Sequence, residues 1–111
     1  MNSSSEILGE INYKIIDAET YEEIPVGTFI KFDGIIDEKP ILKNSPSKKP
    51  FRVQLARFYI ETHFSVNGIK MKYEGPAFLR KGENITIWGK KQISYFDARQ
   101  IETESFIITL D

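Results

Sequence analysis

The chain has 111 residues, of which 41% are hydrophobic and 28% charged, and it contains no cysteine. These values fit one soluble globular domain and exclude disulfides, thiolate metal sites and a cysteine nucleophile. No apolar run reaches the roughly 18 residues of a membrane span, and the polar start does not resemble a signal peptide. We expect a flexible arm or linker at residues 1–6 and a single cytoplasmic-type domain over residues 7–111.

Charge is divided into blocks along the chain, although the net charge is only −1. Residues 40–91 hold 11 Lys or Arg and three acids, whereas residues 1–39 hold nine acids and three Lys. Residues 92–111 hold four acids and one Arg. A basic block of this kind indicates a polyanionic partner. The alternative is internal neutralisation, in which the acidic ends fold back over the basic middle.

The first part of the chain has the alternation of β-strands. Apolar and polar residues alternate over 9–16, which is typical of a half-buried strand. Residues 17–25 are acidic and irregular, with room for one helical turn. A second strand is predicted over 28–36, where Gly34 suggests a bulge or a tight bend. Three prolines and four lysines predict a loop over residues 38–50.

The middle of the chain predicts a long strand and a hairpin. The apolar phase slips within residues 51–62, which a bulge near Ala56 and Arg57 would explain. Asn67-Gly68 predicts a two-residue hairpin turn because both residues tolerate positive φ. The returning strand then covers residues 69–73.

Three further strands are predicted near the C-terminus. Residues 84–89 place Ile85 and Ile87 inward and Trp88 outward, and two more strands cover residues 96–101 and 106–110. We expect the last of these to pair with the strand at residues 10–16. The chain is therefore predicted to be all-β, with about seven short strands in a sandwich or small barrel.

The order of these features resembles an OB-fold over about residues 26–102. Residues 79–89 (Leu-Arg-Lys-Gly-Glu-Asn-Ile-Thr-Ile-Trp-Gly) are similar to the penultimate strand of nucleic-acid-binding OB domains. Residues 96–102 (Phe-Asp-Ala-Arg-Gln-Ile-Glu) are similar to their last strand. The resemblance implies a small five-stranded OB-type barrel, here with additional N- and C-terminal strands.

Two departures from the OB pattern are visible. The helix that often joins the third and fourth strands would be reduced to a short turn at residues 75–81. Asn67-Gly68 also replaces the turn that is common in the anticodon-binding type. The chain also resembles, more weakly, the small NfeD-type OB domains of membrane-associated proteins. This second resemblance implies a role in protein contacts.

The OB resemblance implies a ligand site on the face of the second and third strands, flanked by the first-to-second and fourth-to-fifth strand loops. The basic block falls on these elements, and single-strand binding needs cations for phosphates and aromatic planes for bases. Trp88 is the first choice of aromatic plane, unless a terminal extension covers it. The predicted nucleic-acid-binding residues are Lys43, Lys48, Lys49, Arg52, Arg57, Tyr59, Lys70, Lys72, Trp88, Lys90, Lys91 and Tyr95.

The sequence therefore predicts a non-catalytic binding module for single-stranded nucleic acid. The alternative is a protein-interaction OB domain of a larger protein, including a membrane-associated one. No catalytic motif or phosphate-binding loop is present, and we expect no enzyme activity, cofactor or metal. His63 is the only histidine and is expected to be an ordinary surface residue.

Overall fold

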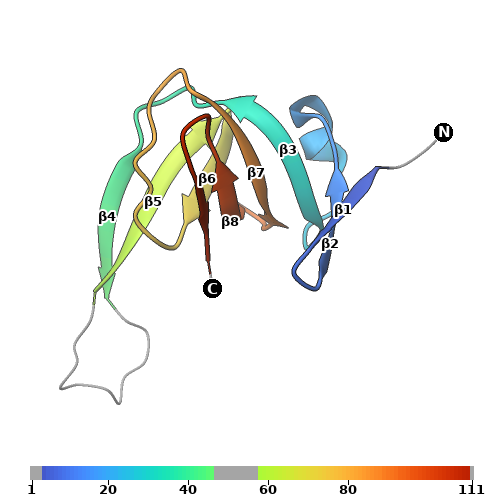
Figure 1. The fold of residues 1–111 in the computed structure, drawn as a ribbon, viewed down its shortest axis with the longest axis horizontal. Helices are drawn as coiled ribbons and strands as arrows, with labels where there is room; N and C mark the ends of the chain where they lie inside the picture. Colours follow the sequence, from blue (N-terminus) through green and yellow to red (C-terminus); the bar gives the residue numbers. More distant parts are fainter. Residues whose placement is uncertain (1–3, 47–57, 111) are drawn as a thin grey trace, which may run out of the picture.

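The computed structural model describes residues 4–46 and 58–110, which form one curled, mostly antiparallel sheet and one short 3₁₀ helix (Figure 1). The elements are β1 (Ser5–Leu8), β2 (Ile11–Ile15), η1 (Ala18–Glu23), β3 (Phe29–Ile35), β4 (Ile41–Pro46), β5 (Phe58–Val66), β6 (Ile69–Tyr73), β7 (Asn84–Lys91), β8 (Phe96–Glu102) and β9 (Ile107–Thr109). No helix in these residues is long and apolar enough to cross a membrane.

Five strands form the barrel, in the order β3-β7-β8-β6-β5. All neighbours are antiparallel except β6 and β8, which are parallel. An isolated bridge between Ile36 and Val66 closes the barrel, and the Asp37 N–H donates to the Ser65 carbonyl at 3.0 Å beside it. The five-stranded OB-type barrel with additional terminal strands is confirmed.

The core follows from the period-two alternation of the barrel strands, because every second side chain points inward. Phe32 and Phe96 meet edge to face at the centre, with ring centroids 5.3 Å apart. Tyr21 of η1 packs on both rings, at 5.8 and 5.9 Å, and so covers one end of the barrel. Side chains of this size stabilise the fold by about 1.5–3 kcal/mol each when fully buried.

The predicted hairpin turn between β5 and β6 is confirmed. Asn67 and Gly68 have φ of 50° and 81°, as a primed two-residue turn requires. The turn is also attached to the end of β3, since the side-chain oxygen of Asn67 accepts the Ile35 N–H at 3.0 Å. The turn therefore supports the closure of the barrel.

Gly34 was predicted to mark a bulge or a tight bend, and its regular register opposite Ile85 shows that no bulge occurs there in the pairing with β7. Glycine is needed here because the Val66 side chain packs closely against the backbone of β3. An added Cβ would lie 2.2 Å from a methyl carbon of Val66. The irregularity occurs instead between β7 and β8, where the register shifts at Trp88 and Gly89. The bulge expected near residues 56–57 lies outside the described residues.

The predicted pairing of the two terminal strands is wrong. β2 lies antiparallel to β1 and parallel to β3, whereas β9 folds back on β8. The turn before β9 explains this local choice, since the Thr103 hydroxyl accepts the N–H groups of Ser105 and Phe106 at 3.0 and 3.1 Å. A hairpin closed by such a turn forms at less entropic cost than a pairing of the two chain ends.

Two segments have more regular structure than their composition predicted. Ser5 and Glu6 belong to β1, although a flexible arm was expected there. β4 occupies part of the predicted loop, antiparallel to β5. Its position at the end of the sheet order explains how a strand can contain Pro46, because an edge strand need not donate on both sides.

Candidate nucleic-acid interface

The outer surface of β5 and β6 brings together several of the predicted cations. Residues that are directly paired in a sheet project from the same face. The register sets His63 opposite Lys72 and Lys43 of β4 opposite Glu61, and Lys70 projects from the same side of β6 as Lys72. We name this surface, made of Lys43, Glu61, His63, Lys70 and Lys72, the β5–β6 face.

Glu61 is the electrostatic centre of the β5–β6 face. Its carboxylate lies 3.1 Å from Nε2 of His63 and 3.5 Å from Nζ of Lys72. Burial raises the pKa of Glu61, but the hydrogen bond with His63 and the charge of Lys72 outweigh this effect and lower the pKa overall. Glu61 therefore stays ionised and holds both neighbours in place. The spacing of Glu61 and His63, two residues apart on a strand, is the signal by which sequence reasoning could have found this pair.

The flanks of the β5–β6 face carry a cation–aromatic pair and two exposed lysines. The ammonium of Lys72 lies 5.2 Å from the ring centroid of Tyr95, which is half-buried in the connection from β7 to β8. Lys43 and Lys70 are exposed and have no ion-pair partner among the described residues. The predicted grouping of Lys43, Lys70, Lys72 and Tyr95 thus exists as one outward surface.

Lys90 lies beyond Asp97, at the rim of this surface. Asp97 of β8 is its partner in the strand register, and the Lys90 ammonium lies 5.5 Å from the ring centroid of Phe29. Burial raises the pKa of Asp97 and the charge of Glu74 adds to this rise, which neighbouring cations oppose. Asp97 separates Lys90 from the lysines of β6, so Lys90 is a peripheral member of the site.

Trp88 is not the exposed plane that the alternation predicted. It is on the outer side of β7, as its parity indicated, but only 4% of it is exposed. Its indole N–H donates to Oε2 of Glu6 at 3.3 Å, and the ammonium of Lys31 lies 4.9 Å from its ring centroid. The terminal extension that was the alternative does reach Trp88, through the side chain of Glu6 on β1.

Lys91 is a structural residue and is excluded from the interface. The strand β7 continues two residues past Gly89, which turns Lys91 toward the barrel. Its ammonium is buried, donates to the carbonyls of Tyr21 and Ile24 at 2.8 Å each, and lies 4.5 Å from the Tyr21 ring centroid. Burial raises the pKa of Tyr21 to about 12. Lys91 thus attaches η1 to the barrel through the last carbonyls of the helix.

The remaining predicted residues are not described. Lys48, Lys49, Arg52 and Arg57 fall within residues 47–57, outside the described ranges, and the side chain of Tyr59 is likewise outside them. Their roles stay predictions of the sequence. In the described ranges no three His, Asp or Glu side chains group as metal ligands would.

No protein-family model and no curated protein matches the chain. Among solved structures, a chain of the S. pombe Stn1–Ten1 complex is similar, with a TM-score of 0.52 and 15% sequence identity. The similarity covers 88% of this chain and 82% of that chain. At this identity the similarity concerns the fold alone. Together with the strand order and the barrel closure, it shows that the chain has an all-β, OB-type fold.

Proposed function

We propose that this chain is a non-catalytic domain that binds single-stranded nucleic acid on the β5–β6 face. One observation carries the proposal: exposed ammonium groups of Lys43 and Lys70 flank the Lys72–Tyr95 pair on the outer surface of an OB-type barrel. Cations that follow a phosphate backbone, next to an aromatic ring on which a base can stack, are what such binding requires.

The proposed contact is mainly electrostatic. Phosphates neutralised by lysines release counterions, so the affinity falls as salt rises and depends little on sequence. Tyr95 can stack one base, a contact worth about 1–3 kcal/mol. Glu61 repels phosphate from the centre of the face, which places the backbone near the flanking lysines and keeps the affinity modest.

We expect Lys43→Gln and Lys70→Gln each to weaken oligonucleotide binding about fivefold, or by about 1 kcal/mol. Each change should also make the slope of log K against log salt shallower by about 1, because one contact between a lysine and a phosphate is lost. Fluorescence anisotropy of a labelled single strand of mixed sequence measures both quantities. Lys14→Gln is the matched control, since Lys14 is exposed on β2, outside the β5–β6 face. Equal losses in all three variants would contradict the placement of the site.

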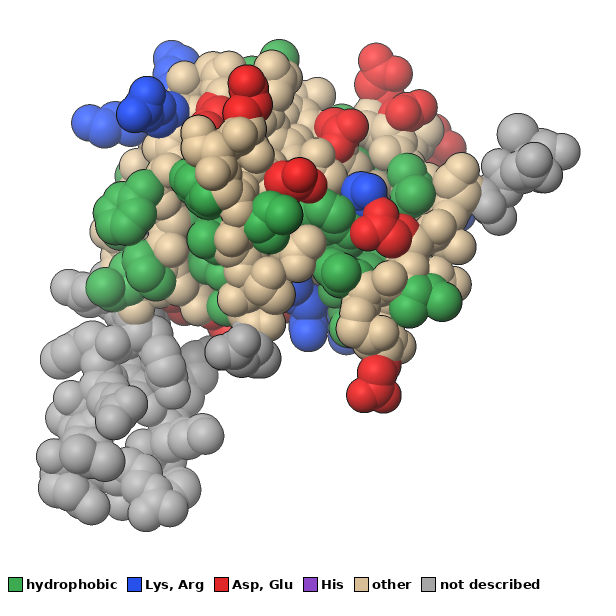
Figure 2. Space-filling view, in the orientation of Figure 1, with side chains coloured by type: hydrophobic (Ala, Val, Ile, Leu, Met, Phe, Trp, Pro, Cys, Tyr) green, Lys and Arg blue, Asp and Glu red, His purple; other side chains and the backbone are tan. Residues whose placement is uncertain are grey.

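A groove with exposed apolar side chains favours protein binding as the second candidate function. The groove measures about 450 Å³ and includes Leu42, Phe78 and Phe106, which are 43%, 77% and 36% exposed. On the face seen in Figure 2, hydrophobic side chains gather at the left, over β4 and the connection from β6 to β7. Exposed apolar patches of this kind mark protein contacts. The similar S. pombe chain comes from a complex of two proteins.

We take a second copy of this chain as the occupant of the groove. β4 ends the sheet order, so its outer edge is unpaired among the described residues and can pair with the same edge of another copy. The wild-type chain is then expected to show a weight-average mass that rises with concentration in sedimentation equilibrium. Phe78→Ser should abolish this rise, whereas Ile93→Ser, which removes an apolar side chain that is 89% exposed elsewhere, should preserve it. A monomer at all concentrations would contradict self-association.

A further inference from the structure

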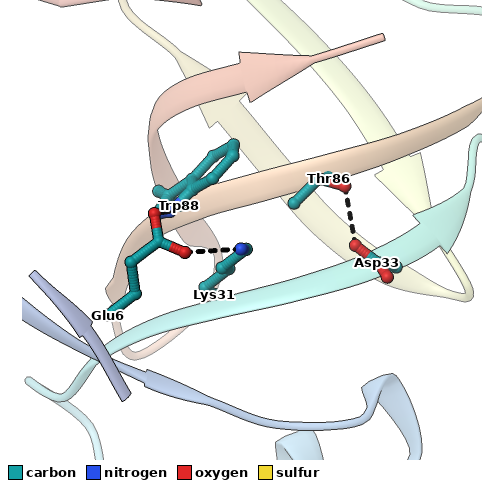
Figure 3. A network of polar contacts seen from close by, with 5 residues as sticks. All are labelled: Glu6, Lys31, Asp33, Thr86 and Trp88. Atoms are coloured by element: carbon teal, nitrogen blue, oxygen red, sulfur yellow. Dashed lines mark hydrogen bonds and ion pairs between the residues drawn. The ribbon is translucent and has the colours of Figure 1, made fainter. Parts of the chain in front are cut away.

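The indole N–H of Trp88 meets a carboxylate that takes two donors at once (Figure 3). Oε1 of Glu6 lies 2.6 Å from the ammonium of Lys31, and Oε2 accepts the indole N–H of Trp88 at 3.3 Å. The hydrogen bond from Lys31 is the main reason that the pKa of Glu6 is lowered. An apolar side chain would suffice to keep Trp88 from water, but here an anion fills the position.

The same groups are suited to a nucleotide. An ammonium and an indole N–H are donors for a phosphate oxygen, and the indole ring offers a surface for a base. Further along β3 and β7, the Thr86 hydroxyl donates to Asp33 at 2.7 Å, and this acid would repel a phosphate. The anion position is therefore confined to Lys31 and Trp88, which we name the Trp88 subsite.

β1, which occupies the Trp88 subsite, is weakly attached to the barrel. It contains no buried residue, and Ile7 is 72% exposed. Among the strands that the structure describes, it pairs only with β2, and β2 meets β3 through two register pairs, Lys14–Ile30 and Ile15–Lys31. The free energy needed to open a peripheral strand with few contacts is lower than the free energy needed to unfold the whole domain.

We propose that the Trp88 subsite is a second nucleotide-binding site, in which the Glu6 carboxylate stands in for the phosphate. A phosphodiester of a bound single strand displaces β1, accepts the donors of Lys31 and Trp88, and places a base against the indole. This inference rests on the proposed nucleic-acid binding and adds a site outside the β5–β6 face.

The inference can be tested directly because Trp88 is the only tryptophan of the chain. A single-stranded oligonucleotide should change the Trp88 emission of the full chain at the same concentrations at which anisotropy reports binding. Glu6→Ala removes the competing carboxylate and should tighten binding roughly fivefold, as expected when the competent state becomes more populated. Glu10→Ala removes a charge from the turn that follows β1 and should leave the affinity unchanged. The double variant Glu6→Ala, Trp88→Phe should bind the oligonucleotide without the gain in affinity that Glu6→Ala gives. Circular dichroism confirms that the double variant is folded.

The outcomes separate this inference from the function on which it rests. Salt-dependent oligonucleotide binding with constant Trp88 emission, and with equal affinity in Glu6→Ala and wild type, would overturn the Trp88 subsite and leave the β5–β6 face intact. No binding by wild type or Glu6→Ala, even at low salt, would overturn both. An acidic peptide that changes the Trp88 emission when the oligonucleotide does not would overturn the assignment to nucleic acid.

Discussion

Gly89→Ala is expected to lower the free energy of unfolding by about 3 kcal/mol, the upper range for overpacking. A Cβ at this position would lie 2.2 Å from the carbonyl oxygen of Asp97 and 2.7 Å from the ring of Phe96. Neither neighbour can move freely, because the carbonyl lies at the register shift between β7 and β8 and Phe96 packs on Phe32 in the core. Equilibrium denaturation in urea measures the change.

The matched control for this prediction is Gly82→Ala. Gly82 has a φ of 91°, but nothing lies within 4 Å of an added Cβ. Its replacement should lower stability only by the backbone strain, about 1–2 kcal/mol. If Gly89→Ala were no more harmful than Gly82→Ala, the close packing at the β7–β8 register shift would be refuted.

Lys91→Met is expected to lower the free energy of unfolding by about 2–4 kcal/mol. The substitution keeps a flexible chain but leaves the carbonyls of Tyr21 and Ile24 without their donor, and each unpaired buried acceptor costs about 1–3 kcal/mol. Amide hydrogen exchange should report that η1 loses protection before the barrel strands do.

Lys90→Met is the control for this second prediction, because Lys90 is adjacent but only partly buried. It should change stability by less than about 0.5 kcal/mol, as surface substitutions usually do. Oligonucleotide binding by folded Lys91→Met should match wild type, since Lys91 faces the barrel. A stable Lys91→Met variant that lost binding would return Lys91 to the interface and contradict its structural role.

The barrel itself could be predicted because its signals are local. Alternation gives the inward face of a strand, and Asn67-Gly68 fixes a turn by its own backbone preferences. The same alternation correctly set Trp88 on the outer side of β7. It could not show that Glu6 of β1 contacts the indole, because this hydrogen bond joins residues 82 positions apart.

Lys91 was misplaced for a different physical reason. The strand was expected to end at Gly89, which would leave Lys90 and Lys91 together in a loop. The strand continues to Lys91 because Gly89 permits the register shift without ending the ladder. Alternation then places Lys90 outward and Lys91 inward, and a run of two lysines is divided between a surface and the interior.

The acidic N-terminal block does not neutralise the β5–β6 face. β2 and η1 lie beside β3, on the opposite side of the fold from β4 and β5 (Figure 1). The ion pair that Glu6 makes is with Lys31, which belongs to the N-terminal block itself. The N-terminal acids thus lie apart from the β5–β6 face, whereas Asp97 of the acidic C-terminal block lies between Lys72 and Lys90.

The most direct test is a titration of the wild-type chain with a labelled single-stranded oligonucleotide at several salt concentrations. Contacts from Lys43, Lys70 and Lys72 predict salt-dependent binding in which log K falls linearly with log salt, with a slope of about −2. No binding at low salt, or an affinity that does not change up to about 0.15 M salt, would contradict the assignment of the β5–β6 face to nucleic acid.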